Sequence, residues 1–166
     1  MAAALERYER PLIRYAASIT GDVELARDVV QDTFLKLCTA DPAKVRDRLA
    51  AWLYTVCRNR ALDVRKKERR MNTASEAQAA NQAAPGPAPA TVAERNETHA
   101  LVLDALATLP KTQQEAFRLK FQDDLSYREI SQIMGVSLGK VSNLMAAALD
   151  TIRQRLRAGI DLAQEV

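Results

Sequence analysis

The chain has 166 residues, of which 48% are hydrophobic and 5% aromatic, and its formal net charge is +3. This length allows one ordinary domain or two small ones. No apolar run is long enough to cross a membrane, and the stretch "MAAALERYERPL" lacks the apolar centre of a secretory signal. We therefore expect a cytoplasmic protein without membrane insertion, in which Cys38 and Cys57 are small buried thiols in a reducing compartment.

The positive charge is concentrated in the first part of the chain. Residues 1–70 contain 15 Lys/Arg against 10 Asp/Glu, whereas residues 71–97 contain one against three. Residues 98–166 contain eight of each. Contact with a polyanion such as nucleic acid should therefore be strongest in the first block.

The first block is predicted to contain three helices. A stripe at helical spacing defines a helix that ends at Thr20-Gly21: Leu5, Tyr8, Leu12, Tyr15, Ala16 and Ile19. Asp22 can cap a second helix with the stripe Val23, Ala26, Val30, Phe34 and Leu37. After the interruption "TADPAKVRD", a third helix with the stripe Leu49, Leu53, Val56, Cys57, Ala61 and Val64 ends in "RKKERR".

The segment 71–97 is predicted to be a flexible Ala/Pro-rich linker. It contains "PGPAP", which does not suit a regular helix or strand, and it has almost no bulky apolar residue. A loop of this length inside one compact domain would be uncommon. We therefore predict an all-α protein with two small helical domains, residues 1–70 and 98–166, joined by this linker.

The last block is predicted to contain a helix-turn-helix. "THALVLDALATLP" is a helix ended by Pro110, and the pairs Thr112/Glu115 and Ser126/Glu129 have capping-box spacing. The stretch "SYREISQIMGVSLGKVSNLMAAAL" then has apolar residues where the two helices would pack: Ile130, Met134, Val136, Val141 and Leu144. Ser131 is the small residue at the crossing, Gly135 suits the turn and Ser137 can cap the second helix. The alternative is an ordinary helical hairpin.

The second helix of this motif would present four residues to a major groove: Leu138, Lys140, Ser142 and Asn143. Asn suits adenine and Lys suits guanine. The helix then becomes apolar in "LMAAALDTIRQRLR", so its own DNA affinity should be weak. Such a module is plausible only if something else holds it on DNA.

The third helix of the first block carries the basic run. Residues 58–70 contain seven Lys/Arg and two acids. A solvated helix end would explain a bare run of this kind, and we expect Trp52 and Tyr54 to belong to the core. The combination of cations and aromatic residues nevertheless suits single-stranded or distorted DNA.

These stretches together resemble the extracytoplasmic-function class of bacterial RNA polymerase sigma factors. "DVELARDVVQDTFLKL" resembles the family helix that docks on the clamp of the polymerase largest subunit, and "AAWLYTVCRNRALDVRKKERR" resembles the helix that melts and reads the −10 element. "LPKTQQEAFRLKFQDDLSYREISQIMGVSLGKVSNLMAAALDTIRQRL" resembles the −35-reading domain. The resemblance implies core RNA polymerase and promoter DNA as partners, with an anti-sigma factor or a regulatory kinase as further candidates.

The resemblance also assigns site residues by position. The implied polymerase-binding residues are Glu24, Asp28, Gln31 and Asp32. The implied −10 residues are Arg58, Asn59, Asp63, Arg65 and Lys66, and the family captures a flipped base in the loop that corresponds to residues 41–48. The implied −35 residues are Ser137, Lys140, Ser142 and Asn143.

Two positions depart from the family pattern. Arg27 stands where the docking motif usually has an acid that faces a basic coiled coil, and "GKVSNL" places Leu144 where an arginine is usual. These departures keep open the alternative of a degenerate sigma-like protein that binds polymerase. A stand-alone helix-turn-helix regulator is a further alternative, although the lack of net charge in residues 98–166 argues against it.

An enzyme is not expected. The one histidine, His99, borders the linker and should be exposed to solvent. The sequence has no paired metal ligands, no glycine-rich phosphate loop and no nucleophile with a plausible base, so we predict no catalytic residue, cofactor or metal.

Overall fold

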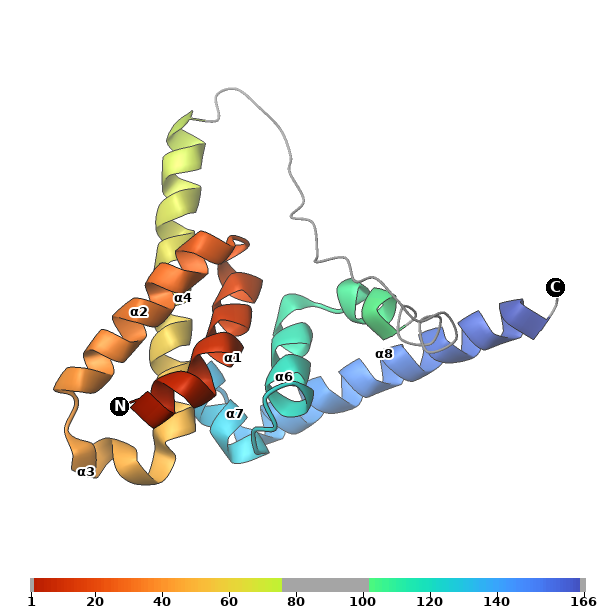
Figure 1. The fold of residues 1–166 in the computed structure, drawn as a ribbon. Coiled ribbons are helices and arrows are strands. Elements are labelled where there is room, and N and C mark those ends of the chain that lie inside the picture. The colour runs from red at the N-terminus through yellow and green to blue at the C-terminus, as the bar shows by residue number, and fades with distance from the viewer. Residues whose placement is uncertain (1, 76–101, 165–166) are drawn as a thin grey trace. The chain divides into compact units, whose positions relative to one another are not determined.

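The computed structural model describes residues 2–75 and 102–164, and the chain divides into two compact units, Met1–Pro85 and Gly86–Val166. Every regular element in the described ranges is a helix, which confirms the all-α prediction (Figure 1). Most of the predicted linker, together with His99, lies outside the described residues.

The first unit consists of three long helices and a short helical connection. In chain order these elements are α1 (Ala2–Thr20), α2 (Val23–Thr39), α3 (Pro42–Val45), a 3-10 turn (Arg46–Arg48) and α4 (Leu49–Ser75). Gly21 ends α1 in the left-handed conformation with a φ of +80°, which glycine adopts at little cost. The Asp22 side chain then accepts a hydrogen bond from the Leu25 N–H at 2.9 Å, so the predicted cap of the second helix is confirmed.

The core of the first unit is formed where α1, α2 and α4 face one another. Leu12 of α1 and Leu53 of α4 are fully buried, and the Tyr15 and Tyr54 rings pack at 5.2 Å between centroids. This confirms the predicted core position of Tyr54, whereas Trp52 is only half-buried. The remaining buried side chains come from these three helices and, for Val45, from α3: Ala16, Ala26, Val29, Val30, Thr33, Phe34, Val45, Ala51, Cys57 and Ala61.

The two cysteines have different environments. Cys57 is buried as predicted, and desolvation raises the pKa of its thiol to about 12, against a smaller lowering effect of a hydrogen bond with Thr33. The prediction that Cys38 is buried is wrong. Cys38 is exposed in the last turn of α2, where it borders an open groove between α1 and α2.

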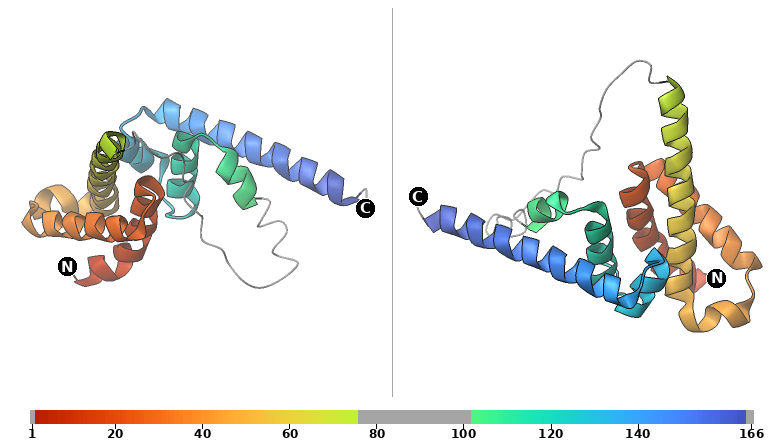
Figure 2. Two further views of the ribbon diagram at one scale, coloured as in Figure 1. Left: turned by 90° about the horizontal axis from the view of Figure 1, so that it is seen from above. Right: turned by 180° about the vertical axis from the view of Figure 1, so that it is seen from behind.

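Helix α4 is much longer than the core that it helps to form. It continues past the ends of α1 and α2, as Figures 1 and 2 both show, and it runs to Ser75. The helix therefore enters the segment that the sequence predicts as a linker. Residues 66–71 are all exposed, so this part of α4 is a charged helical extension rather than a packing element.

The second unit begins with a helix at residues 102–108 and continues with α6 (Lys111–Phe121), α7 (Tyr127–Met134) and α8 (Leu138–Gln164). Its core includes the buried residues Ala105, Leu109, Ala116, Leu119, Leu125, Ile130, Ile133, Met134, Val141, Leu144, Met145, Ala148 and Ile152. Gln114 is buried among them, and its amide donates a hydrogen bond to the Leu109 carbonyl at 2.8 Å. This bond satisfies a buried polar group and fixes α6 against the end of the preceding helix.

One predicted cap in this unit is wrong. The pair Thr112/Glu115 does not form a capping box, because α6 already begins at Lys111 with Pro110 in the N-cap position and no side-chain cap. Thr112 therefore lies inside the first turn. Proline fits at this helix start because it has no N–H that would need a partner there.

None of the helices in the described ranges has the length and apolar character that a membrane crossing requires. The same residues contain no cluster of three or more side chains able to hold a metal ion.

Candidate functional site

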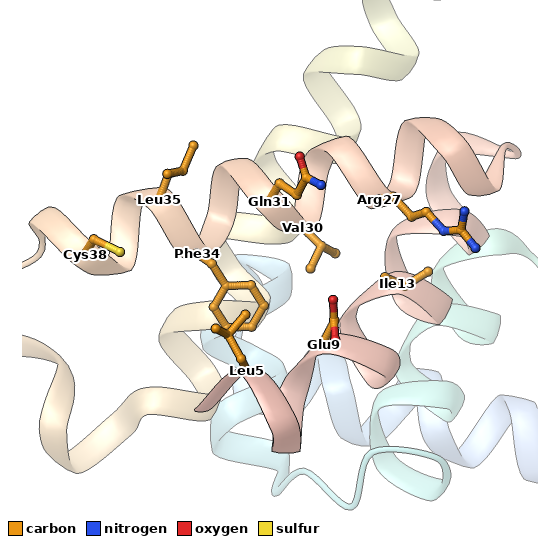
Figure 3. A pocket seen from close by; sticks show the side chains of 9 residues that line it. All are labelled: Leu5, Glu9, Ile13, Arg27, Val30, Gln31, Phe34, Leu35 and Cys38. Atoms are coloured by element: carbon orange, nitrogen blue, oxygen red, sulfur yellow. The ribbon is translucent and has the colours of Figure 1, made fainter. Parts of the chain in front are cut away.

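The first candidate surface is a groove between α1 and α2. It has a volume of about 390 Å³ and an apolar floor (Figure 3). Leu5 and Glu9 of α1 face Val30 and Phe34 of α2, and Arg27 lies at one end of the groove. The other lining residues are Ile13, Gln31, Leu35 and Cys38. An open apolar floor with a carboxylate and a guanidinium at its edges suits contact with another protein.

The predicted polymerase-binding residues lie along α2, beside and within this groove. Glu24, Asp28 and Gln31 are exposed, and Asp32 is half-buried. Of these four, Gln31 is the one that lines the groove. The three carboxylates lie at positions 24, 28 and 32, a spacing of four that places them on one face of the helix.

Two of these carboxylates already have cationic partners. Glu24 accepts a hydrogen bond from Arg27 at 2.8 Å, so the residue that departs from the family motif neutralises the acid next to it. Asp32 accepts a hydrogen bond from the Nε of Arg60 at 2.8 Å, which links α2 to α4. The side chains of both pairs are more than two fifths exposed to solvent, so the pairs contribute little to stability.

The second candidate surface is the outer part of α4. Asn59, Asp63 and Lys66 follow one another at spacings of four and three and are exposed, so they form one stripe. Arg65 is half-buried beside this stripe. Arg58 is also half-buried and makes a contact within the protein. The structure therefore brings the predicted −10 residues together on one long helix.

The connection between α2 and α4 adds further positive charge to the first unit. Lys44, Arg46 and Arg48 are all exposed. Asp41 is not available as a free carboxylate, because it caps α3 by accepting a hydrogen bond from the Ala43 N–H at 3.0 Å. The short helix and the 3-10 turn replace the irregular loop that the sequence suggests, so the backbone that carries these cations is helical.

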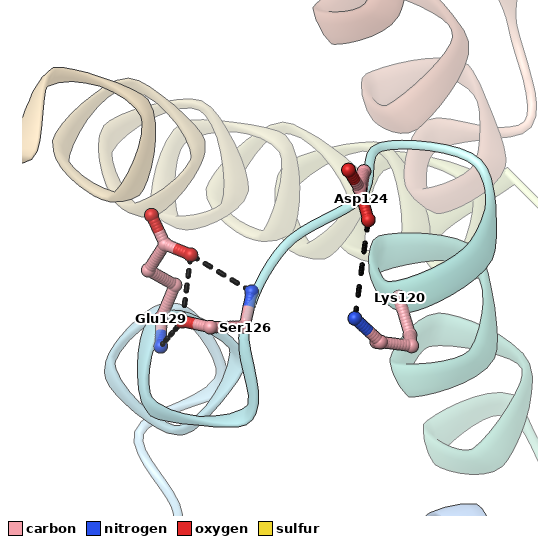
Figure 4. Close-up of polar contacts among 4 residues, drawn as sticks. All are labelled: Lys120, Asp124, Ser126 and Glu129. Carbon is pink, nitrogen blue, oxygen red and sulfur yellow. Dashed lines mark hydrogen bonds and ion pairs between the residues drawn. The ribbon is translucent and has the colours of Figure 1, made fainter.

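The third candidate surface is the helix-turn-helix formed by α7 and the start of α8. Ser126 and Glu129 form the predicted capping box, in which each side chain bonds to the backbone N–H of the other residue (Figure 4). Gly135 is left-handed with a φ of +65°, as predicted for the turn. The Ser131 hydroxyl donates a hydrogen bond to the Val136 carbonyl at 2.6 Å, which ties α7 to the turn that follows it.

The four predicted −35 residues are exposed at the start of α8, but they are not equivalent. The Ser137 hydroxyl accepts the Lys140 N–H at 3.2 Å, so Ser137 caps the helix as predicted. The Ser142 hydroxyl donates to the Leu138 carbonyl within the helix. The side chains of Lys140 and Asn143 take part in neither of these bonds. Leu144 is only 8% exposed, so the leucine that replaces the usual arginine packs in the core.

Sequence reasoning missed two features of these surfaces. The basic run does not distinguish Arg60 from its neighbours, although the Arg60 guanidinium pairs with Asp32 of α2. The α1 side of the groove, with Glu9 and Ile13, was also missed. A periodic pattern identifies the buried stripe of one helix, but it does not show which exposed residues of two helices meet.

Family comparisons match both units. The model for "Sigma-70 region 2" matches residues 4–71, and the model for "Sigma-70, region 4" matches residues 99–152.

Several curated relatives are similar over most of the chain. The chain is 30% identical to "ECF RNA polymerase sigma factor RpoE" of Cereibacter sphaeroides, over 80% of this chain and 71% of the relative. It is 27% identical to "ECF RNA polymerase sigma factor SigM" of Bacillus subtilis, over 92% and 90%. It is 29% identical to "ECF RNA polymerase sigma factor SigL" of Mycobacterium tuberculosis, over 95% and 89%.

A solved structure has the same fold. It is the sigma factor RpoE from Bartonella quintana, crystallised in complex with the anti-sigma factor NepR. The TM-score is 0.66 at 24% sequence identity, over 94% of this chain and 96% of the other.

Proposed function

Because the chain belongs to the extracytoplasmic-function class of sigma-70 RNA polymerase sigma factors, it is a promoter-specific initiation factor that works with core RNA polymerase and promoter DNA, and we propose how its residues divide these contacts. The exposed face of α2 binds the polymerase through Glu24, Asp28, Gln31 and Asp32. The outer part of α4 binds the melted −10 element, and the start of α8 reads the −35 element.

The main observation that supports this division of polymerase and promoter contacts is the placement of charge on α4. The helix leaves the core of the first unit and exposes cations over its last turns, where no other described element covers them. Arg58, Arg65 and Lys66 follow the phosphate backbone, and Asn59 and Asp63 face the bases. A cationic surface of this kind suits an unpaired strand, because much of single-strand affinity comes from phosphate contacts.

Binding of the unpaired strand supplies the free energy for melting. A surface that binds single-stranded −10 DNA better than the duplex lowers the free energy of the open complex. The protein itself performs no covalent chemistry in this scheme, so it is not an enzyme and needs no metal or cofactor. It acts in the cytoplasm, where its polymerase and promoter partners are.

The second unit helps to position the polymerase on the promoter more than it adds to the affinity for DNA. Residues 98–166 have no net charge, so the helix-turn-helix makes few phosphate contacts of its own. Lys140 and Asn143 specify bases while the polymerase holds the unit on DNA. This weak intrinsic affinity argues against a regulator that would use the helix-turn-helix alone.

The test is transcription reconstituted with core polymerase and a promoter found by mapping transcript starts. Replacing Arg58, Arg65 and Lys66 by glutamine should weaken open-complex formation, measured by permanganate reactivity of the −10 strand, more than it weakens core binding. The salt dependence of open-complex formation should also become shallower by about 0.7 per lost single-strand phosphate contact.

A matched control removes the same charge from the second unit. The control variant replaces Arg153, Arg155 and Arg157, all exposed on α8, by glutamine. It should reduce permanganate reactivity less than the α4 variant does. Equal loss of core binding and melting in the α4 variant, or loss of neither, would count against the assignment of α4.

Regulation by a protein partner is consistent with the groove between α1 and α2. The structure from Bartonella quintana contains an anti-sigma factor, and the open groove beside the docking face offers a surface for a partner of this kind. A phosphorylating kinase remains a second candidate regulator.

A further inference from the structure

We propose that Asp32 and Arg60 form an exchangeable ion pair that keeps one cation of the DNA-binding helix occupied until the polymerase binds. This proposal rests on the assignment of α2 to polymerase and of α4 to DNA. When the polymerase binds, one of its cations replaces Arg60 as the partner of Asp32. Arg60 then becomes free to bind a phosphate of the promoter.

The pair joins two surfaces with different partners. Asp32 lies on the face of α2 that also carries Glu24 and Asp28. Arg60 lies on α4, next to Asn59 in sequence and one turn before Asp63. Asp32 and Arg60 are 28 positions apart in the chain, so their contact forms only when α2 and α4 are packed together.

The geometry permits exchange. One guanidinium nitrogen, Nε, bonds to one carboxylate oxygen at 2.8 Å. The side chains remain 45% exposed for Arg60 and 41% exposed for Asp32, so both can be reached by another molecule without any movement of the helices. An exposed single-contact pair is weakly bound, whereas arginine can bind phosphate through two parallel hydrogen bonds.

The charges make the exchange favourable in the presence of both partners. In the free protein, the carboxylate reduces the attraction of Arg60 for DNA. A polymerase cation that pairs with Asp32 removes this competition, and Arg60 gains a phosphate contact at the same time. Polymerase binding and DNA binding are thereby coupled through two side chains, and by linkage each strengthens the other.

The experiment measures binding of the full chain, without polymerase, to a fluorescent single-stranded DNA of random sequence over a range of salt concentrations. Asp32→Asn should bind severalfold more tightly than wild type at low salt. Its plot of log affinity against log salt should be steeper by about 0.7, the value for one additional single-strand phosphate contact. The double variant Asp32→Asn/Arg60→Gln should lose this additional slope.

Glu6→Gln is the matched control for net charge. Glu6 is exposed on α1, and its replacement removes one negative charge while Arg60 stays paired. Its salt slope should equal that of wild type. In the complete holoenzyme at saturating core, the salt slopes of wild type and Asp32→Asn for promoter binding should converge, because the polymerase has already taken Asp32.

The proposal is overturned if Asp32→Asn has the same salt slope as wild type, or if the double variant keeps the additional slope. These outcomes are distinct from failure of the proposed function. That failure would appear as wild-type protein that neither co-elutes with core polymerase nor supports transcription, and the measurement on the free chain does not depend on it.

Discussion

Replacement of Arg27 by glutamate should strengthen binding to core polymerase. The resemblance to the family implies an acid at this position that faces a basic coiled coil. Here Arg27 has the opposite charge and pairs with Glu24 at 2.8 Å. The side chains are 57% exposed for Arg27 and 79% for Glu24, so a partner can reach both of them. The substitution removes one repulsive charge, adds an attractive one and releases Glu24.

The size of the effect follows from the exposure of these groups. An exposed ion pair contributes about 0.2–1 kcal/mol. Two such changes give roughly 0.5–2 kcal/mol, which corresponds to a dissociation constant lower by about 2-fold to 30-fold. The lost pair between Glu24 and Arg27 and the like charge that replaces it together cost α2 only about 0.4–1 kcal/mol, so the helix remains folded.

The assay is competition between variants for a limiting amount of core polymerase, with fluorescence anisotropy as the readout. Arg27→Gln should give about half of the gain in free energy, and Asp28→Asn should weaken binding. All differences should shrink as salt is raised, because exposed charges are screened. A weaker complex with Arg27→Glu would show that the docking face of α2 is assigned wrongly.

Three further predictions concern the thiols, the loop before α7 and the cap of α7. At pH 8 a thiol reagent should modify Cys38 quickly and Cys57 only on unfolding, because Cys57 is buried and its pKa is raised to about 12. The stability that the protonated Cys57 thiol provides is fully present below pH 9 and should be lost as pH rises toward 12, by about 1.4 kcal/mol per pH unit. Asp124 has a φ of +52°, so Asp124→Val should lower the free energy of unfolding by about 1–2 kcal/mol, whereas Asp124→Gly should change it by less than about 1 kcal/mol. Ser126→Ala should cost about 1 kcal/mol by removing the cap of α7.

Each of these predictions has a measurement that can contradict it. Rapid modification of two thiols in the folded protein would refute the first, and Cys57→Ala should remove its share of the alkaline loss of stability. Denaturant unfolding tests the other two. Equal stability of the valine and glycine variants at position 124 would show that its backbone is not strained, and an unchanged unfolding midpoint for Ser126→Ala would show that the cap is not needed.

The sequence by itself determined the helices, because burial of one face imposes a periodic pattern on each of them. It also determined the turn at Gly135 and the caps at Asp22 and Ser126, since these depend on the chemistry of a few adjacent residues. The capping box predicted at Thr112 is wrong, because the spacing of two residues does not show that the helix already starts at Lys111.

Only the tertiary structure decided which exposed groups meet. The pairing of Asp32 with Arg60 requires α2 and α4 to be packed in one register, and the exposure of Cys38 requires the groove that α1 leaves open. Neither feature has a local signal, because each depends on the distance between residues far apart in the chain. Periodicity predicts which face of a helix is buried in the core. The packing of the helices determines which residues of other helices its exposed face contacts.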